Sequence, residues 1–302
     1  MRHRFRLLAL ASALAALLAM AAPAAAITYG QLDDGEHPYV GFLIFFDPAT
    51  PGWFSCSGTL LDADTVLTAG HCVADVGTDG GMATSAGAND IWFTIDPDDT
   101  LAGWPARTED ISEEDLYALR SAWLNDPANG YVRGTAIPHP EYENFAAFPM
   151  NFDVGVVELP TGSFPMDTYG ELAPIGSVEV LAGTTGRDRN LALVETVGYG
   201  TQSVQPHPQS DDTRYKSTSR IVQVNGNIVD GGNLHTLNNP STIGGQGGSC
   251  FGDSGGPVFI NDTNQILAVV SFGFSGTCHG ADYSWRVDTV SSQDFITPFV
   301  SA

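Results

Sequence analysis

The chain has 302 residues and a formal net charge of −23, from 35 acidic and only 12 basic side chains. This acidic balance argues against a nucleic-acid partner and against binding to an anionic membrane surface, because both are polyanionic. It suits a soluble protein with a solvated acidic surface.

The first 26 residues have the pattern of a secretory signal peptide. Three arginines within the first six residues precede an apolar stretch at residues 7–22, and three alanines at residues 24–26 form a small-residue cleavage site. The apolar stretch is short for a membrane span, and no later stretch reaches about 18 apolar residues. We therefore expect residues 27–302 to be released as a secreted, extracellular domain. The alternative is an uncleaved membrane anchor.

Short apolar runs broken by glycine, proline, asparagine and aspartate follow along the chain. They are typical of an all-β protein, and they lie at residues 40–46, 65–68, 154–159, 191–197 and 266–272. Prolines and glycines cluster at residues 161–171, where we expect the chain to cross between two halves.

Residues 96–129 depart from this pattern. Ser112 followed by three acidic residues predicts a helix start, because serine caps the N-terminus and acidic side chains favour the first turn. Apolar residues then recur at helical spacing, at Leu116, Leu119 and Trp123. Two interpretations are open: a surface helix packed through Leu116 and Trp123, or an acidic rim beside a cleft that favours basic substrates.

Four cysteines, in a chain expected to be secreted, indicate two disulfides, and spacing alone allows three pairings of Cys56, Cys72, Cys250 and Cys278. The sequence contains no Cys-x-x-Cys and no His-Glu-x-x-His spacing. We therefore expect no metal site and no cofactor.

Three short strings hold candidate catalytic residues. His71 ends the string LTAGH, Asp153 lies in FDVGVVEL, and Ser254 lies in GDSGGP. A serine hydroxyl is a poor nucleophile at neutral pH, so it needs a base within hydrogen-bond reach, and the base needs an orienting partner. The glycines beside Ser254 allow a tight turn that exposes its hydroxyl.

The string around Ser254 also fits the Gly-x-Ser-x-Gly pattern of α/β-hydrolases. That fold requires the acid and the histidine to follow the serine in the chain. Only His279 follows Ser254, and no clear amphipathic helix precedes Thr289. This alternative therefore fails on residue order and on the remaining length.

Together the three strings resemble those of the chymotrypsin/trypsin-type serine proteases, in that family's order of histidine, aspartate and serine. The resemblance covers nearly the whole chain after the signal peptide and indicates a secreted, bacterial-like member. It implies two packed six-stranded antiparallel β-barrels with the active site in the cleft between them. His71 and Asp153 would lie in a first barrel of about residues 27–160, and Ser254 in a second of about residues 171–302.

The resemblance also implies a role for each residue. Ser254 attacks the scissile carbonyl, His71 takes and returns the proton, and Asp153 holds the His71 tautomer. The backbone N–H groups of Gly252 and Ser254 form the oxyanion hole. The implied activity is hydrolysis of peptides or proteins by a monomer. Two other classes stay open: a secreted binding protein that keeps the fold without turnover, and an esterase for small acyl esters.

The same resemblance selects the disulfides Cys56–Cys72 and Cys250–Cys278, and it bears on specificity. Trypsin-like members carry an aspartate six residues before the nucleophile, at the base of the pocket, but this chain has Gly248 there. The triplet Ser271-Phe272-Gly273 resembles the family's strand that pairs with the substrate backbone. Asp282 falls near the pocket wall, where it either reaches a basic substrate side chain or lies in an exposed loop.

The string Ile27-Thr28-Tyr29-Gly30 resembles the Ile-Val-Gly-Gly start of active family members. In that family the freed N-terminal amine pairs with the aspartate before the nucleophile, which is Asp253 here, and this pairing orders the site. Because Ile27 directly follows the small-residue cleavage site, signal-peptide removal would itself activate the enzyme. The alternative is cleavage elsewhere, with Ile27 as ordinary strand lead-in.

Overall fold

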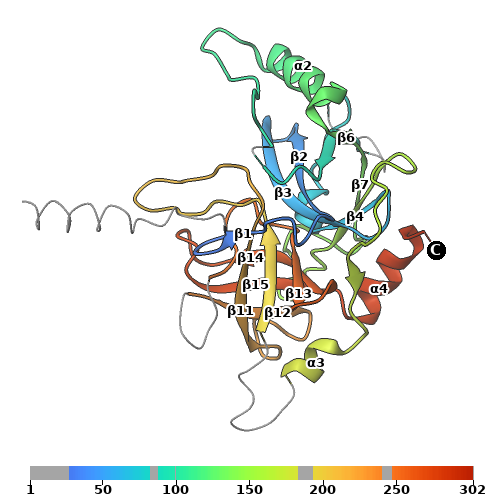
Figure 1. Ribbon diagram of the computed structural model, residues 1–302, viewed down its shortest axis with the longest axis vertical. Coiled ribbons are helices and arrows are strands. Elements are labelled where there is room, and N and C mark those ends of the chain that lie inside the picture. The colour runs from blue at the N-terminus through green and yellow to red at the C-terminus, as the bar shows by residue number, and fades with distance from the viewer. Residues whose placement is uncertain (1–26, 82–87, 99, 183–192, 240–246, 302) are drawn as a thin grey trace, which may run out of the picture.

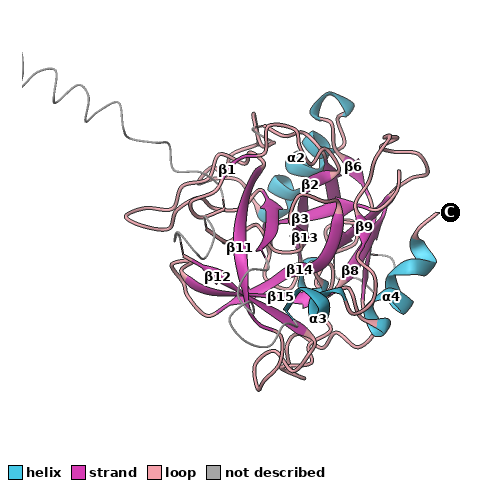
Figure 2. Ribbon diagram, turned by 60° about the horizontal axis from the view of Figure 1, so that its bottom comes forward, coloured by secondary structure: helices cyan, strands magenta, loops and turns pink. Residues whose placement is uncertain are grey.

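The computed structural model describes residues 27–81, 88–98, 100–182, 193–239 and 247–301, so the predicted signal peptide lies outside the described residues. Two antiparallel β-sheets, each curled into a barrel, pack against one another, and the few helices lie on the outside (Figures 1 and 2). None of the helices in the described ranges is long and apolar enough to cross a bilayer.

The first barrel is a seven-stranded sheet in the order β6-β5-β2-β3-β4-β8-β7. Only Gly134 separates β6 from β7 in the chain, and Ala136 forms a bridge with Ala88 just before β5, so the sheet nearly closes. The strands are β2 (Val40–Asp47), β3 (Gly52–Leu60), β4 (Thr65–Thr68), β5 (Ile91–Thr94), β6 (Val132–Arg133), β7 (Thr135–Pro138) and β8 (Gly155–Glu158).

The second barrel closes fully, in the order β11-β10-β13-β14-β15-β12, with β12 pairing back to β11. Two short strands extend it: β1 pairs with β11, and β9 runs parallel to β14. The strands are β1 (Gln31–Leu32), β9 (Glu171–Leu172), β10 (Leu193–Gly198), β11 (Tyr215–Gln223), β12 (Asn233–Asn238), β13 (Pro257–Ile260), β14 (Gln265–Gly273) and β15 (Gly280–Arg286).

The expected all-β fold of two barrels is confirmed, although the first barrel has seven strands and not six. The N-terminal segment belongs to the second barrel, through β1 and through a bridge between Thr28 and Gly248. Arg214 fixes this segment to both barrels, because its buried guanidinium bonds Asp33 at 2.9 Å and the Val40 carbonyl at 2.8 Å. The N-terminal segment therefore joins the two halves.

The helical part of the insertion is α2 (Glu113–Leu124), which covers the outer face of the first barrel (Figure 1). The Ser112 hydroxyl caps it by accepting a hydrogen bond from the Asp115 N–H at 3.0 Å. Leu116 and Leu124 are buried and Trp123 packs on Trp104, as expected of a helix packed through Leu116 and Trp123, whereas Leu119 is 48% exposed.

Strand β2 is buried on both faces because the insertion covers it. Leu43 and Phe45 point into the barrel core, while Phe42 and Ile44 pack in a separate aromatic cluster with residues of the insertion. None of the described residues of the insertion lines either of the two active-site cavities described below. The structure therefore favours a packed surface helix over an acidic rim.

Two further helices are short and peripheral: α3 (Ser177–Ala182) and α4 (Val290–Ile296). Helix α4 begins where the Thr289 hydroxyl accepts from the Ser292 N–H, and it packs Ile296 into the core near the C-terminus. These helices lie away from the residues discussed next.

Candidate active site

His71 and Asp153 meet at one end of the first barrel. His71 lies in a single 3-10 turn (Gly70–Cys72) directly after β4, and Asp153 lies just before the paired strand β8. The Asp153 carboxylate accepts from the His71 backbone N–H at 2.8 Å and lies 2.9 Å from Nδ1 of the ring. Two contacts from one residue fix both the position and the tautomer of the imidazole.

Asp153 is fully buried, yet it stays ionised because three donors surround it. Burial alone raises its pKa, but the charge of His71 and hydrogen bonds from His71 and Ser271 lower it below the ordinary value. The Ser271 hydroxyl, on β14 of the second barrel, donates to Asp153 at 2.5 Å. Ser271, predicted only as a substrate-binding residue, therefore also holds the carboxylate from the opposite barrel.

Ser254 lies on a tight turn between a disulfide-bonded loop and β13. Gly255 follows it with a φ of +76°, and a Cβ there would lie 2.0 Å from Oγ1 of Thr68, so only glycine fits. The Ser254 carbonyl accepts from the Ser57 N–H at 2.8 Å, which fixes the turn against β3. No hydrogen bond links Ser254 to His71 among the described residues, although both line the same cavity.

The backbone N–H groups of Gly252 and Ser254 donate to no acceptor within the described ranges. Both residues are only partly buried, so their unpaired N–H groups can meet water or a ligand. Gly252 has a φ of +100°, a conformation that favours glycine. Free donors of this kind can bind a negatively charged oxygen.

Both expected disulfides are present. Cys56–Cys72 ties β3 to the turn that carries His71, and Cys250–Cys278 ties the Ser254 loop to the segment before β15. Each bridge therefore supports one side of the cleft. With Cys56 and Cys72 bonded to each other, their sulfurs beside His71 are not free metal ligands.

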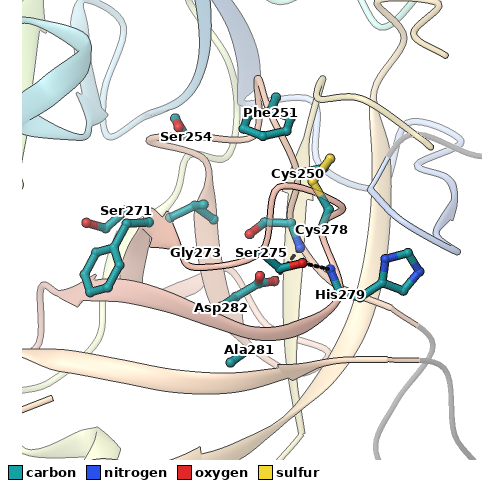
Figure 3. A pocket seen from close by; sticks show the side chains of 13 residues that line it. Cys250, Phe251, Ser254, Ser271, Gly273, Ser275, Cys278, His279, Ala281 and Asp282 are labelled. Atoms are coloured by element: carbon teal, nitrogen blue, oxygen red, sulfur yellow. Dashed lines mark hydrogen bonds between the residues drawn. A yellow bond between two sulfur atoms is a disulfide. The ribbon is translucent and has the colours of Figure 1, made fainter. Parts of the chain in front are cut away.

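A cavity of about 250 Å³ opens beside Ser254 (Figure 3). Its lining includes four of the five predicted substrate-binding residues: Ser271, Phe272, Gly273 and Asp282. Figure 3 shows Ser254 at one end of the lining residues and Asp282 with Ala281 at the other. The Cys250–Cys278 disulfide forms part of the wall.

Asp282 supplies a buried carboxylate to this cavity. Its oxygens accept from Asn238 Nδ2 at 2.9 Å and from the Ser249 N–H at 2.6 Å, and it has no ion pair within the described residues. Burial raises the pKa of Asp282 to about 6, although these two donors act against the rise. An exposed loop position, the alternative for Asp282, is thus wrong, because the residue is 7% exposed.

Gly248, the fifth predicted substrate-binding residue, does not line the cavity, but its lack of a side chain leaves room for the Asp282 carboxylate. A Cβ at Gly248 would lie 2.4 Å from a carboxylate oxygen of Asp282 and 2.5 Å from Cγ of Asn238. A side chain at position 248 and the observed carboxylate of Asp282 therefore exclude each other. The carboxylate that lines this cavity therefore comes from Asp282 and not from position 248.

Asp253 is fully buried behind the Ser254 turn. Its carboxylate accepts from the N–H groups of Gly200 and Cys250, both at 2.8 Å. Burial raises the pKa of Asp253 to about 7, because no cation lies against it among the described residues. Ile27 is also fully buried, but its nitrogen is a peptide nitrogen while residue 26 is attached, so the predicted amine pair is absent here.

A second and larger cavity, of about 670 Å³, adjoins the first at Ser254 and Phe251. Its lining includes Trp53, Phe54, Asp75 and the ring of His71. The two cavities together form a groove that crosses the candidate nucleophile. Sequence reasoning missed this second half, because its residues come from loops whose meeting no local pattern indicates.

Comparison with known families assigns the chain. A family model described as Trypsin matches residues 30–92 and 120–296. The chain belongs to the trypsin family of serine endopeptidases. The unmatched residues 93–119 fall mostly within the insertion that the sequence pattern singled out.

Trypsin-family relatives are similar at low identity. The chain is 26% identical over 258 residues to brachyurin of Leptuca pugilator, covering 81% of this chain and 90% of brachyurin. It is also 26% identical over 220 residues to serine protease SP24D of Anopheles gambiae, covering 72% of this chain but only 62% of that protein.

Solved structures with the trypsin-family fold match most of the chain. HL collagenase matches with a TM-score of 0.59 and 18% identity, over 91% of this chain and all of that one. The inactivated protease paralogue S-D1 of the scabies mite matches with a TM-score of 0.57 and 16% identity, over 91% of this chain and 99% of that one. At these identities the structural likeness shows the fold alone, and one of these similar structures is an inactivated protease. Evidence for catalytic activity must therefore come from the site itself.

The environment of His71 gives a first prediction for this trypsin-family site. Burial lowers the pKa of His71, but the charge of Asp153 and its hydrogen bond raise this pKa by more. The net pKa of His71 therefore lies above the ordinary value of 6.5. We expect histidine NMR on the Ser254→Ala protein to show a His71 pKa above 6.5. In the Ser254→Ala/Asp153→Asn protein the raising charge is gone, so burial should bring the pKa below 6.5. An identical pKa in both proteins would contradict the pairing.

The same pKa sets the acid limb of activity. His71 accepts a proton only when neutral, so kcat/KM should fall as pH drops through a midpoint near or somewhat above 6.5. A rate that stays constant from about pH 5 to 8 would exclude His71 as the base.

Proposed function

We propose that this protein is a secreted serine endopeptidase that forms an acyl-enzyme on Ser254, with His71 as base and Asp153 as its orienting partner. The observation that carries the proposal is the hydrogen-bonded His71–Asp153 pair at the groove that also contains Ser254. The free N–H groups of Gly252 and Ser254 support their role as the oxyanion hole. The reaction needs no cofactor.

We further propose that the pocket takes an arginine or lysine side chain at P1, the residue whose carbonyl Ser254 attacks. The Asp282 carboxylate has hydrogen-bond donors but no cation among the described residues, so a basic side chain would provide the missing opposite charge. The small size of the cavity and its position beside Ser254 fit a single side chain. Ser271, Phe272 and Gly273 would then contact the substrate backbone.

A peptide-library cleavage profile of the purified mature protein tests both proposals. We expect cleavage after arginine and lysine, and faster labelling of wild type than of Ser254→Ala by a fluorophosphonate. A folded protein that neither labels nor cleaves would be a binding protein on the protease fold. Hydrolysis of small acyl esters without hydrolysis of any peptide amide would indicate the esterase.

Activation is proposed to follow from signal-peptide removal. Within the described part of the uncleaved chain, no cation lies against the buried Asp253, and Ile27 is already buried and packed with Tyr215 of the second barrel. A freed amine at Ile27 would supply that cation, and losing one partner of a buried pair costs about 3–5 kcal/mol. We therefore expect Asp253→Asn to lose most activity although Asp253 lies outside the triad.

N-terminal sequencing of the active enzyme checks this mechanism, and an engineered chain with one extra alanine before Ile27 provides the matched control. The extra residue moves the amine away, so that chain should be folded but nearly inactive. Activity should also fall in strong alkali, because the paired amine titrates above its free value of about 7.7–8.0. Full activity from a chain that starts at any residue other than Ile27 would refute the mechanism.

We propose that the mature enzyme is an extracellular monomer that binds peptide or protein substrates, and neither nucleic acid nor membranes. The two disulfides support an oxidising compartment. The excess of acidic side chains supports the absence of polyanionic partners. Recovery of the active protein from the culture medium, followed by light scattering, tests location and oligomeric state together.

A further inference from the structure

We propose that Thr28 and Asn238 are positioning residues for the P1 pocket, in which the Thr28 hydroxyl fixes the Asn238 amide and that amide fixes the Asp282 carboxylate. The inference rests on the proposed P1 role of Asp282. It adds two residues that do not line the cavity and extends the specificity site to the N-terminal segment.

Asn238 uses both ends of its side chain. Its Nδ2 donates to Asp282 Oδ1 at 2.9 Å and to the Ser249 carbonyl at 2.7 Å. Because both partners are acceptors, the amide nitrogen must face them and the amide oxygen must face away. That oxygen accepts from the Thr28 hydroxyl at 2.7 Å. With 1% of Asn238 exposed, water cannot readily replace these partners.

Thr28 is held as firmly as the side chain it bonds. It is 2% exposed, forms an antiparallel bridge with Gly248, and its hydroxyl also lies 3.1 Å from the Gly248 carbonyl. A Cβ on Gly247 would lie 1.6 Å from the Thr28 carbonyl oxygen. The two backbones are therefore in direct contact, and the N-terminal segment forms the back of the pocket wall.

The carboxylate of Asp282 depends on this support. Its second oxygen is held by the Ser249 N–H at 2.6 Å, and the missing side chain of Gly248 leaves the space it occupies. Without the Asn238 donor, one carboxylate oxygen loses its hydrogen bond and the group can rotate. A binding group that must be ordered by its ligand binds more weakly than one already ordered.

Three variants test the relay, which is the chain of hydrogen bonds from Thr28 through Asn238 to Asp282. They are Asn238→Ala, Thr28→Val, which removes the hydroxyl at nearly constant shape, and Thr28→Ser, which keeps the hydroxyl. Each is compared with wild type as mature protein with the same first residue. Three readouts are taken: the ratio of kcat/KM for two peptides that differ only in arginine or leucine at P1, the inhibition constant of benzamidine, and the rate of fluorophosphonate labelling.

We expect Asn238→Ala to lower the arginine-to-leucine ratio about 10- to 100-fold, because it removes a hydrogen bond to a charged group. Thr28→Val acts one step further away and should lower the ratio about three- to tenfold, while Thr28→Ser should match wild type. Benzamidine inhibition should weaken in parallel with the ratio. The labelling rate should not change, because the reagent does not need the P1 charge.

The outcomes separate the proposals. The relay would be overturned if the arginine-to-leucine ratio were unchanged in both Asn238→Ala and Thr28→Val. It would also be overturned if labelling, arginine cleavage and leucine cleavage all fell equally. A wild type that labels and cleaves without preferring arginine would overturn both the relay and the role of Asp282, but not the protease assignment. A wild type that neither labels nor cleaves would overturn the proposed function and the relay with it.

Discussion

Ser254→Ala is expected to lower peptidase activity by more than about a thousandfold while the protein stays folded. Among the described residues, Ser254 carries the only hydroxyl that lines both cavities, and its half-buried side chain makes no hydrogen bond that the fold needs. His71→Ala should have a similar effect, because triad members act as a unit and their losses do not add. The residual rate would come from substrate binding and the oxyanion hole alone.

The measurement is kcat/KM on a peptide substrate, with thermal unfolding to confirm the fold. Ser163→Ala is the matched control, because the Ser163 hydroxyl donates to the Pro160 carbonyl in the connection between the barrels and lines neither cavity. Retention of more than about a tenth of wild-type activity in folded Ser254→Ala would exclude the triad assignment.

Asp282→Asn is expected to lower kcat/KM for arginine at P1 about 100- to 1000-fold, with a much smaller change for leucine. It removes the charge that faces a buried cation at almost constant volume, and an unpaired buried charge costs about 3–5 kcal/mol. Asp294→Asn, on the exposed side of α4, is the matched control for loss of one negative charge. Equal losses for both peptides, or no loss for arginine, would contradict the proposed pocket.

The preference for arginine should itself depend on pH. Burial raises the pKa of Asp282 to about 6, so the carboxylate is charged above that pH and becomes neutral as pH falls through it. The arginine-to-leucine ratio should therefore be highest at neutral pH and decline below about 6. Among the described residues, the Asp282 carboxylate accepts hydrogen bonds from Asn238 and Ser249 and interacts electrostatically with Asp253. Taking the ratio removes the effect of His71, which limits both substrates equally.

The sequence predicted the parts of this site that lie within short strings. The surroundings of His71, Asp153 and Ser254 are local patterns, and the disulfide pairing followed from the family that they resemble. The same resemblance placed Asp282 near the pocket through the matched end of β15. Strand number in the first barrel was not predictable in this way, because β6 and β7 differ from one continuous strand only at Gly134.

Contacts between segments far apart in the chain could not be predicted from the sequence. Nothing in the sequence near Asn238 indicates that its amide lies between Thr28 and Asp282. From the sequence, Gly248 indicates only that an acidic group is missing, and the structure adds that a side chain there would clash with Asp282. Ser271 was predicted to face substrate, and only the packing of the two barrels brings its hydroxyl to Asp153. Such relations depend on how the barrels dock, which periodicity within a strand does not encode.

The contact between Thr28 and the pocket wall also has a consequence for the timing of synthesis. Thr28 is among the first residues of the domain to be made, yet its partners Asn238 and Gly248 follow 210 and 220 residues later. Contacts of such long sequence separation form late in folding. A nascent chain therefore lacks a finished pocket until almost all of it has been made.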